Sequence, residues 1–344
     1  MNESYTESGA APVAAAASPV PYKNRSAGLI VFGVLTILLG CMAGLMVLLM
    51  LLGQIMGSAV QKPEAQLPFS TLLMAVAIYG GLAVALVWLG IGSILARRWA
   101  RALLLIFSWC WLIMGLSAIL FLAFFMPPLM KSLAGGGRPG QPEMPQAAVG
   151  VMLVFMFLIW GVGFVVLPAV WTYFYHSRHV KATCEARDPV TRWTDACPLP
   201  VLGLCLMLVV SAAMFLLMPM AMHGILPFFG MFLSGLPGSL LCLALAGVWS
   251  YAAWSLYRLQ ARGWWLILIA LLVFLLSSVL TYARHDPMEL YGLMGYTPAQ
   301  LEQLNQFNQT GLLTSGHMVG LMVISMTPFL IYLLWIKKYL RRPC

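Results

Sequence analysis

Apolar residues in this chain are gathered into long runs, separated by shorter segments that carry most of the charged residues. Each run has about 20 residues or more, the length that an α-helix needs to cross a hydrocarbon core roughly 30 Å thick. The runs lack the polar/apolar alternation of membrane β-strands, so helices are the spanning structure that they allow. We therefore predict an all-α polytopic transmembrane helical bundle with eight spans, at about 28–52, 71–95, 102–126, 149–174, 199–222, 238–257, 263–283 and 312–336.

The lysines and arginines predict how this bundle is oriented. Short loops on the cytoplasmic side of a membrane carry an excess of these residues. Eight spans place both termini on one side, and 15 of the 19 basic residues then fall on that side. The other four are Lys62, Lys131, Arg138 and Arg284. We predict cytoplasmic N and C termini, with residues 1–26, rich in Ala, Pro and Ser, forming a disordered cytoplasmic tail.

The chain carries a weak internal repeat. A shift of 161 positions lays Leu82–Trp88 over Leu243–Trp249, and 12 of the 36 positions from Leu82 to Ser117 are then identical. The matches include one tryptophan and two arginines, which apolar composition alone does not explain. We predict a parallel tandem duplication of a four-helix unit. The halves are 27–176 and 199–344, joined by a cytoplasmic linker over 177–198.

Composition excludes a water-soluble protein and gives no sign of nucleic-acid binding. The chain is 62% hydrophobic and 8% charged, against about 25% charged in soluble proteins. Its net charge of +9 comes from basic residues in short loops, where membrane topology explains them. No disulfide framework is expected, because the cysteines lie within spans or on the predicted cytoplasmic side. They are Cys41, Cys110, Cys184, Cys197, Cys205, Cys242 and Cys344.

Two features concern packing rather than chemistry. The segment Met218–Gly238 is apolar but broken by three prolines, which fits either a re-entrant segment or a loop resting on the outer leaflet. The spacing of Gly40 with Gly44, and of Gly53 with Gly57, predicts close approach of a neighbouring helix to the first span.

Candidate chemistry is sparse. No Asp, Glu, Lys or Arg lies in the middle of a predicted span, which argues against ion-coupled transport, and no catalytic motif or cofactor-binding motif is present. The weak metal candidates are three histidines near the outer face: His223, His285 and His317. A zinc site from His176, His179, Cys184 and Cys197 is disfavoured by the wide spacing of the cysteines.

Four arginines are weak candidates for holding anionic lipid headgroups. They are the repeated pairs Arg97 with Arg258 and Arg101 with Arg262, although fixing the topology explains them equally well.

Three functions remain compatible with the sequence. The simplest is a non-enzymatic multi-pass membrane component that works through lipid contacts, a membrane-protein partner or homo-oligomerisation. The second is a permease for a small neutral or apolar solute, moved at the interface of the two halves. The third is a metal-dependent membrane enzyme that uses the outer-face histidines. The expected location is the bacterial inner (plasma) membrane, with the basic-residue asymmetry placing both termini in the cytoplasm.

Overall fold

The computed structural model describes residues 22–60, 69–135, 146–294 and 315–340, with a few residues between 294 and 315. Within these ranges, eight helical spans are long and apolar enough to cross a membrane, so that prediction is confirmed. The tail predicted over 1–26 lies almost wholly outside the described residues. The spans are formed by α1 (Ser26–Val60), α2 (Phe69–Ile94), α3 (Arg98–Gly135), α4 (Gln146–Gly161) continued by α5 (Leu167–His176), α7 (Leu199–Met222), α8 (Gly235–Tyr257), α9 (Ala261–Arg284) and α12 (Ser315–Leu340).

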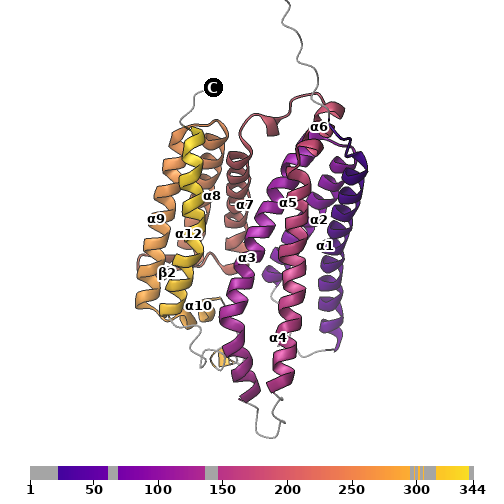
Figure 1. Ribbon diagram of the computed structural model, residues 1–344. Coiled ribbons are helices and arrows are strands. Elements are labelled where there is room, and N and C mark those ends of the chain that lie inside the picture. Colours follow the sequence, from indigo (N-terminus) through magenta and orange to yellow (C-terminus); the bar gives the residue numbers. More distant parts are fainter. Residues whose placement is uncertain are drawn as a thin grey trace, which may run out of the picture.

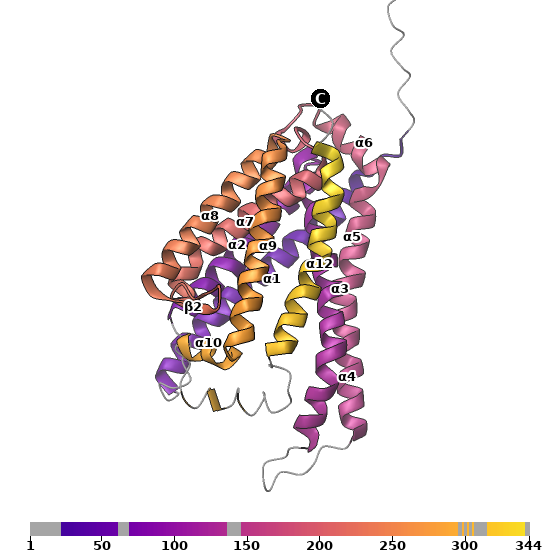
Figure 2. The same cartoon turned by 90° about the vertical axis from the view of Figure 1, so that its left-hand side faces the viewer.

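The spans run roughly side by side, and the chain enters and leaves the bundle at one end (Figures 1 and 2). This end also holds α6 (Arg178–Arg187) and the 3₁₀ turn η3 (Trp193–Asp195), and we call it the linker end. The opposite end, which we call the hairpin end, carries a short β-hairpin and α10 (Pro287–Leu293). Helix α1 packs along α2, and α7 along α8, while α3 lies beside α5 and α9 beside α12.

One buried cluster holds the first four spans together near the linker end. Leu29 of α1, Leu104 of α3 and Tyr175 of α5 are almost completely buried in it. Ser93 Oγ donates to the Leu29 carbonyl at 3.0 Å and lies 2.7 Å from Tyr175 Oη. Since the serine proton is committed to Leu29, the tyrosine hydroxyl is the donor to Ser93. This chain of bonds joins α1, α2 and α5, and it satisfies the buried hydroxyls of Ser93 and Tyr175, which apolar neighbours alone would leave without partners.

A second buried cluster holds the last four spans. Leu204 of α7, Leu256 of α8, Ile267 of α9 and Leu333 of α12 are completely buried there. Trp264 Nε1 donates to the Leu333 carbonyl at 2.7 Å, which satisfies the indole within the packed interior. The two clusters meet at the linker end, where Leu199 of α7 packs against the first cluster.

Small residues allow α1 and α2 to pack backbone against backbone. A Cβ at Gly40 would lie 3.0 Å from the Ala83 carbonyl oxygen, so the close approach predicted there is confirmed. At Gly53 no described atom lies within 4 Å of the position that a Cβ would take, so the structure shows no close approach there; the contacts of Gly57 lie outside the described residues, and that part stays a prediction. The closest approach involves two glycines that the spacing rule did not single out: a Cβ at Gly90 would lie 2.7 Å from the Gly33 carbonyl oxygen.

Helix α3 is longer than the sequence predicts, because it continues beyond residue 126 to Gly135. It packs against the π-helical turn η2 (Val162–Val166), which joins α4 to α5 just before Pro168. Proline lacks an N–H group, and a π-turn is one way for a helix to accommodate the missing bond. A Cβ at Gly115 would collide with the Phe164 carbonyl oxygen, so glycine is required at this crossing.

The broken segment between α7 and α8 forms an antiparallel hairpin. Whether it is re-entrant or rests on the outer leaflet stays a prediction. Strand β1 (Leu226–Phe228) pairs with β2 (Met231–Leu233). The two-residue turn between them consists of Phe229 and Gly230, whose φ angles are 43° and 94°. Positive φ at both turn positions is the type I′ geometry that suits a tight hairpin.

One face of α9 anchors this hairpin. Ser277 Oγ accepts the Phe229 N–H at 2.9 Å, and Thr281 Oγ1 accepts the Gly230 N–H at 3.0 Å. One turn further along, His285 Nε2 lies 3.0 Å from the Gly230 carbonyl oxygen. Ser277 and Thr281 are spaced by four along α9 and therefore share one side of the helix, and His285 is the residue that follows the end of this helix.

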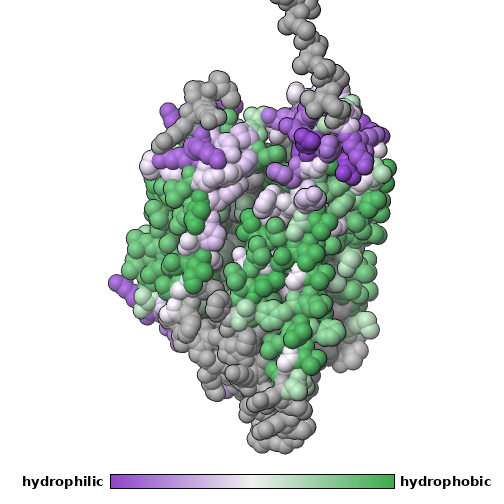
Figure 3. All heavy atoms as spheres, in the orientation of Figure 1, coloured by the Kyte–Doolittle hydropathy of each residue, from purple (hydrophilic) through white to green (hydrophobic). Residues whose placement is uncertain are grey.

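The exterior has the pattern expected of a lipid-embedded protein. Apolar side chains cover the middle of the bundle, and hydrophilic side chains gather at the linker end (Figure 3). Large apolar residues on the outer faces of the spans are well exposed, among them Leu48, Val84, Phe155 and Ile324. Water would not tolerate so large a contiguous apolar surface, whereas lipid chains solvate it.

Candidate functional site

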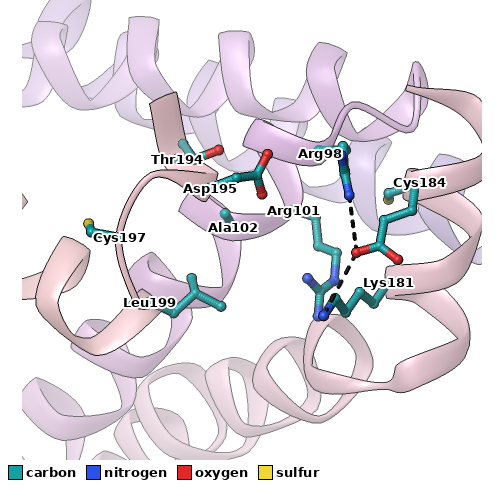
Figure 4. Close-up of a pocket in the computed structure, with 10 residues that line it drawn as sticks. Arg98, Arg101, Ala102, Lys181, Cys184, Thr194, Asp195, Cys197 and Leu199 are labelled. Atoms are coloured by element: carbon teal, nitrogen blue, oxygen red, sulfur yellow. Dashed lines mark ion pairs between the residues drawn. The ribbon is translucent and has the colours of Figure 1, made fainter. Parts of the chain in front are cut away.

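A polar pocket of about 170 Å³ opens at the linker end. Its walls come from α3, from α6, from η3 and from the first residue of α7, so the first half, the linker and the second half all contribute (Figure 4). The lining residues are Arg98, Arg101, Ala102, Lys181, Cys184, Glu185, Thr194, Asp195, Cys197 and Leu199.

Local sequence explains how the cationic side chains reach this pocket. Helix α2 ends in a left-handed residue, Ala96, with φ of 51°, and the Arg97 N–H bonds back to the Gly92 carbonyl at 2.9 Å. This tight turn starts α3 immediately at Arg98. Arg98 and Arg101 are three residues apart and therefore lie on one face of the first helical turn.

The charges of two of these cations are matched by one carboxylate. Glu185 Oε1 lies 3.3 Å from Arg98 Nη2 and 3.8 Å from Lys181 Nζ (Figure 4). The other lining carboxylate, Asp195, uses Oδ2 to accept the Arg192 backbone N–H at 3.0 Å and so caps its own turn. Three cations and two carboxylates leave the pocket with a formal excess of one positive charge.

Arg101 is the cation in this pocket that has no carboxylate of its own. Among the described residues it forms no ion pair, and its buried Nε has no hydrogen-bond partner. The hydroxyl of Thr194 is also buried and unpaired within the described part of the chain. A buried donor without a partner costs roughly 1–3 kcal/mol, so the two groups are suited to an acceptor brought by a ligand. The arrangement can therefore bind an anion.

A buried carboxylate fastens the linker beside the pocket. Asp188, 3% exposed, lies 3.7 Å from Arg97 Nη1 and 3.4 Å from Arg192 Nη2, and it accepts the Arg98 N–H at 3.4 Å. From the second half, Tyr257 Oη donates to the Trp193 carbonyl at 2.9 Å. These bonds hold η3 between the halves. The sequence signals Asp188 only as an acidic residue before a proline, a pattern typical of a turn.

The two pocket cysteines are poor nucleophiles and poor metal ligands at neutral pH. Burial raises the pKa of Cys184, and separately that of Cys197, to about 11, so both remain protonated thiols. The nearby His179 accepts the Lys23 N–H on Nδ1 at 3.3 Å. No group of three or more His, Cys, Asp or Glu side chains suited to a metal ion occurs among the described residues, which include His176.

The outer-face histidines lie at the hairpin end, on different elements. His285 has both ring nitrogens engaged, with Nδ1 2.8 Å from Glu289 Oε2 and Nε2 at the Gly230 carbonyl. His223 ends α7 in a left-handed conformation, with φ of 51°. The side chain of His317 lies outside the described residues, so the three-histidine site stays a prediction.

The four arginine candidates are in different environments. Arg101 lines the pocket, and Arg97 pairs with Asp188 beside it. Arg258 stacks on the Trp254 ring at 4.3 Å, and Arg262 is exposed at the start of α9. Arg97 and Arg101 therefore lie at or beside the pocket, whereas Arg258 and Arg262 lie away from it on the surface of the protein.

No family model, no curated protein and no solved structure matches this chain.

Proposed function

We propose that this multi-pass membrane protein is a non-enzymatic component that holds the phosphate of an anionic phospholipid headgroup in the linker-end pocket. The single observation that carries the proposal is the half-buried Arg101, whose enclosed Nε has no hydrogen-bond partner and which has no carboxylate partner among the described residues. A planar guanidinium matches phosphate oxygens with two parallel hydrogen bonds, and such charge-assisted bonds are about twice as strong as neutral ones.

The position of the pocket supports a lipid as the source of that phosphate. Arg101 lies within the first turn of α3, the turn with which this helix begins at the linker end. Hydrophilic side chains gather at that end, next to the apolar middle of the bundle (Figure 3). Phospholipid headgroups occupy this depth in a bilayer, and basic pockets between helices on the cytoplasmic side bind them. The apolar side chains of Ala102 and Leu199 line the same pocket and suit the glycerol region next to a phosphate.

The proposal includes an orientation and a location. The protein lies in a bacterial inner membrane with its linker end facing the cytoplasm. The 15 basic residues assigned to that side, against four on the other, support the orientation. Contacts with a protein partner, or between copies of the chain, stay predictions. The permease alternative also stays a prediction. The pocket lies where the halves meet, as a permease site would, but all of its lining residues are at the linker end and none lies further along the interface.

Lipid-dependent stabilisation of the purified protein tests this function. A ligand that binds only the folded state raises the melting temperature as its concentration increases. We expect phosphatidylglycerol added to the detergent-solubilised protein to raise Tm above the value with phosphatidylcholine, which has no net charge. Arg101→Gln should abolish most of this increment. Arg262→Gln is the matched control, because that exposed arginine does not line the pocket, and it should retain the increment.

Two outcomes would contradict the proposal. An equal phosphatidylglycerol increment in Arg101→Gln and in the unmodified protein would remove Arg101 from the site. Inorganic phosphate alone giving the full increment would show that the pocket takes a soluble anion rather than a lipid. Arg101→Lys, which keeps the charge but loses the planar donor pair, provides a milder variant whose retained lipid can be counted by native mass spectrometry.

A further inference from the structure

The turns that join α2 to α3 and α8 to α9 have the same hydrogen bonds. In the first, Ala96 is left-handed, with bonds from its N–H to Ser93 O and from Arg97 N–H to Gly92 O. In the second, Leu259 is left-handed with φ of 56°, and its N–H bonds to Leu256 O. The next N–H, of Gln260, bonds to Ser255 O. Every corresponding position in the two turns differs by 163 residues.

Burial follows this shift of 163 and not the shift of 161 that the sequence identities suggest. A shift of 161 pairs Trp88, which is 53% exposed, with Trp249, which is 8% exposed. A shift of 163 pairs Trp249 with Leu86, which is 4% exposed. It likewise pairs Leu104 with Ile267, and both of these are completely buried.

The close contact between the two helices is also repeated. A Cβ at Gly92 would lie 2.6 Å from the Cβ of Ala100. The residues 163 positions later are Ser255 and Gly263, and a Cβ at Gly263 would lie 3.0 Å from the Cβ of Ser255. In the first pair the glycine is on the earlier helix and in the second pair it is on the later one, but the same two positions are in contact. We infer that the two halves are copies of one helical unit, related by a shift of 163 residues.

This equivalence places Trp264 at the position of Arg101. Trp264 is 2% exposed, its Nε1 is bonded to the Leu333 carbonyl, and Lys337 Nζ lies 4.4 Å from the centre of its ring. At this place the second half therefore has an indole whose N–H is hydrogen-bonded, whereas the first half has an arginine whose Nε has no partner among the described residues. The two copies share a fold, and one of them has an open site.

The inference for function is that the chain has one headgroup site, in the first half, and that Arg101 is the residue that distinguishes it from the filled second copy. This step rests on the proposed lipid binding. It gives a stoichiometry of one tightly held anionic lipid per chain, where a symmetric pair of arginine sites would hold two. It also implies that tryptophan fits at position 101, because the equivalent position already accommodates it.

Arg101→Trp tests both parts of the inference at once. We expect this variant to keep a Tm close to that of the unmodified protein. It should retain phosphatidylglycerol at least tenfold more weakly in native mass spectrometry, because a factor of this size is the affinity lost with one charged hydrogen bond. The matched control is Leu103→Trp, since a shift of 161 would place Trp264 opposite Leu103 instead. That variant should lower Tm, because Leu103 already packs against the first cluster and a larger side chain overfills it.

The outcomes separate the two proposals. An Arg101→Trp protein that fails to fold while Leu103→Trp folds normally would overturn the shift of 163. Two phosphatidylglycerol molecules per unmodified chain, one of them lost in Arg262→Gln, would overturn the single site. If the unmodified protein retains no phosphatidylglycerol, the proposed function fails, and the relative stabilities of the two tryptophan variants still decide the equivalence of the halves.

Discussion

Replacing Gly90 by alanine tests the backbone contact between α1 and α2. The new Cβ would lie 2.7 Å from the Gly33 carbonyl oxygen and 2.5 Å from Ile37 Cγ1, whereas ordinary contact begins at 3.4 Å. The oxygen belongs to helical backbone and cannot rotate away. The helices must therefore separate locally by about 0.7 Å, and a gap of this size forfeits a quarter to a half of the dispersion energy of the affected contacts.

The expected cost follows from two opposing effects. Overfilling a packed interface costs about 1–3 kcal/mol, and alanine recovers up to about 1 kcal/mol through its better helix propensity. The net destabilisation should be about 1–2 kcal/mol, which corresponds to a decrease in Tm of a few degrees for a chain of this size. The assay is thermal unfolding of the detergent-solubilised protein, followed by intrinsic tryptophan fluorescence.

Each helix supplies its own control glycine. At Gly53 of α1 and Gly81 of α2 no atom of the described residues lies within 4 Å of the position that a Cβ would take, so alanine there should be neutral or slightly stabilising. The double variant Gly33→Ala with Gly90→Ala should cost less than the sum of the single changes, because one separation of the helices relieves both clashes. A Gly90→Ala protein as stable as the Gly81→Ala protein would refute the reasoning.

Two further predictions concern the linker end. Asp188→Asn removes the carboxylate partner of two half-exposed arginines and should lower the free energy of unfolding by about 1–2 kcal/mol, less than the loss of a fully buried pair. Trypsin should also cleave the segment between 188 and 198 faster. The control is Asp286→Asn, because Asp286 is an exposed helix cap that asparagine replaces well, and it should change neither stability nor cleavage. Cys184 and Cys197 should resist a water-soluble maleimide at pH 8, because a pKa of about 11 instead of 9.0 lowers the thiolate fraction about 100-fold. Folding favours the protonated thiols, so their contribution to stability is complete below pH 9 and is lost as the pH rises toward 11. Rapid labelling of the folded protein at pH 8 would contradict the burial of both cysteines.

Hydrophobic patterning was sufficient to predict the eight spans, because crossing lipid is a property of each segment by itself. A helix must be long enough and apolar enough, and both quantities can be read from consecutive residues. The same information placed the basic residues at one end of the bundle. It also predicted the contact at Gly40, but it missed the closer one between Gly33 and Gly90, since a glycine matters only where a neighbouring helix approaches it.

The sequence by itself therefore determined which segments are solvated by lipid, and the tertiary structure decided which face of each segment is buried. In water, apolar residues mark the buried face of a helix; in lipid, Leu and Val suit both faces, so this signal is lost. For this reason identities at a shift of 161 could align an exposed tryptophan with a buried one. It is also why Arg101 and Arg262, alike in sequence, differ in the folded chain: α6 and η3 enclose the first beside an open pocket, and the second remains on the surface.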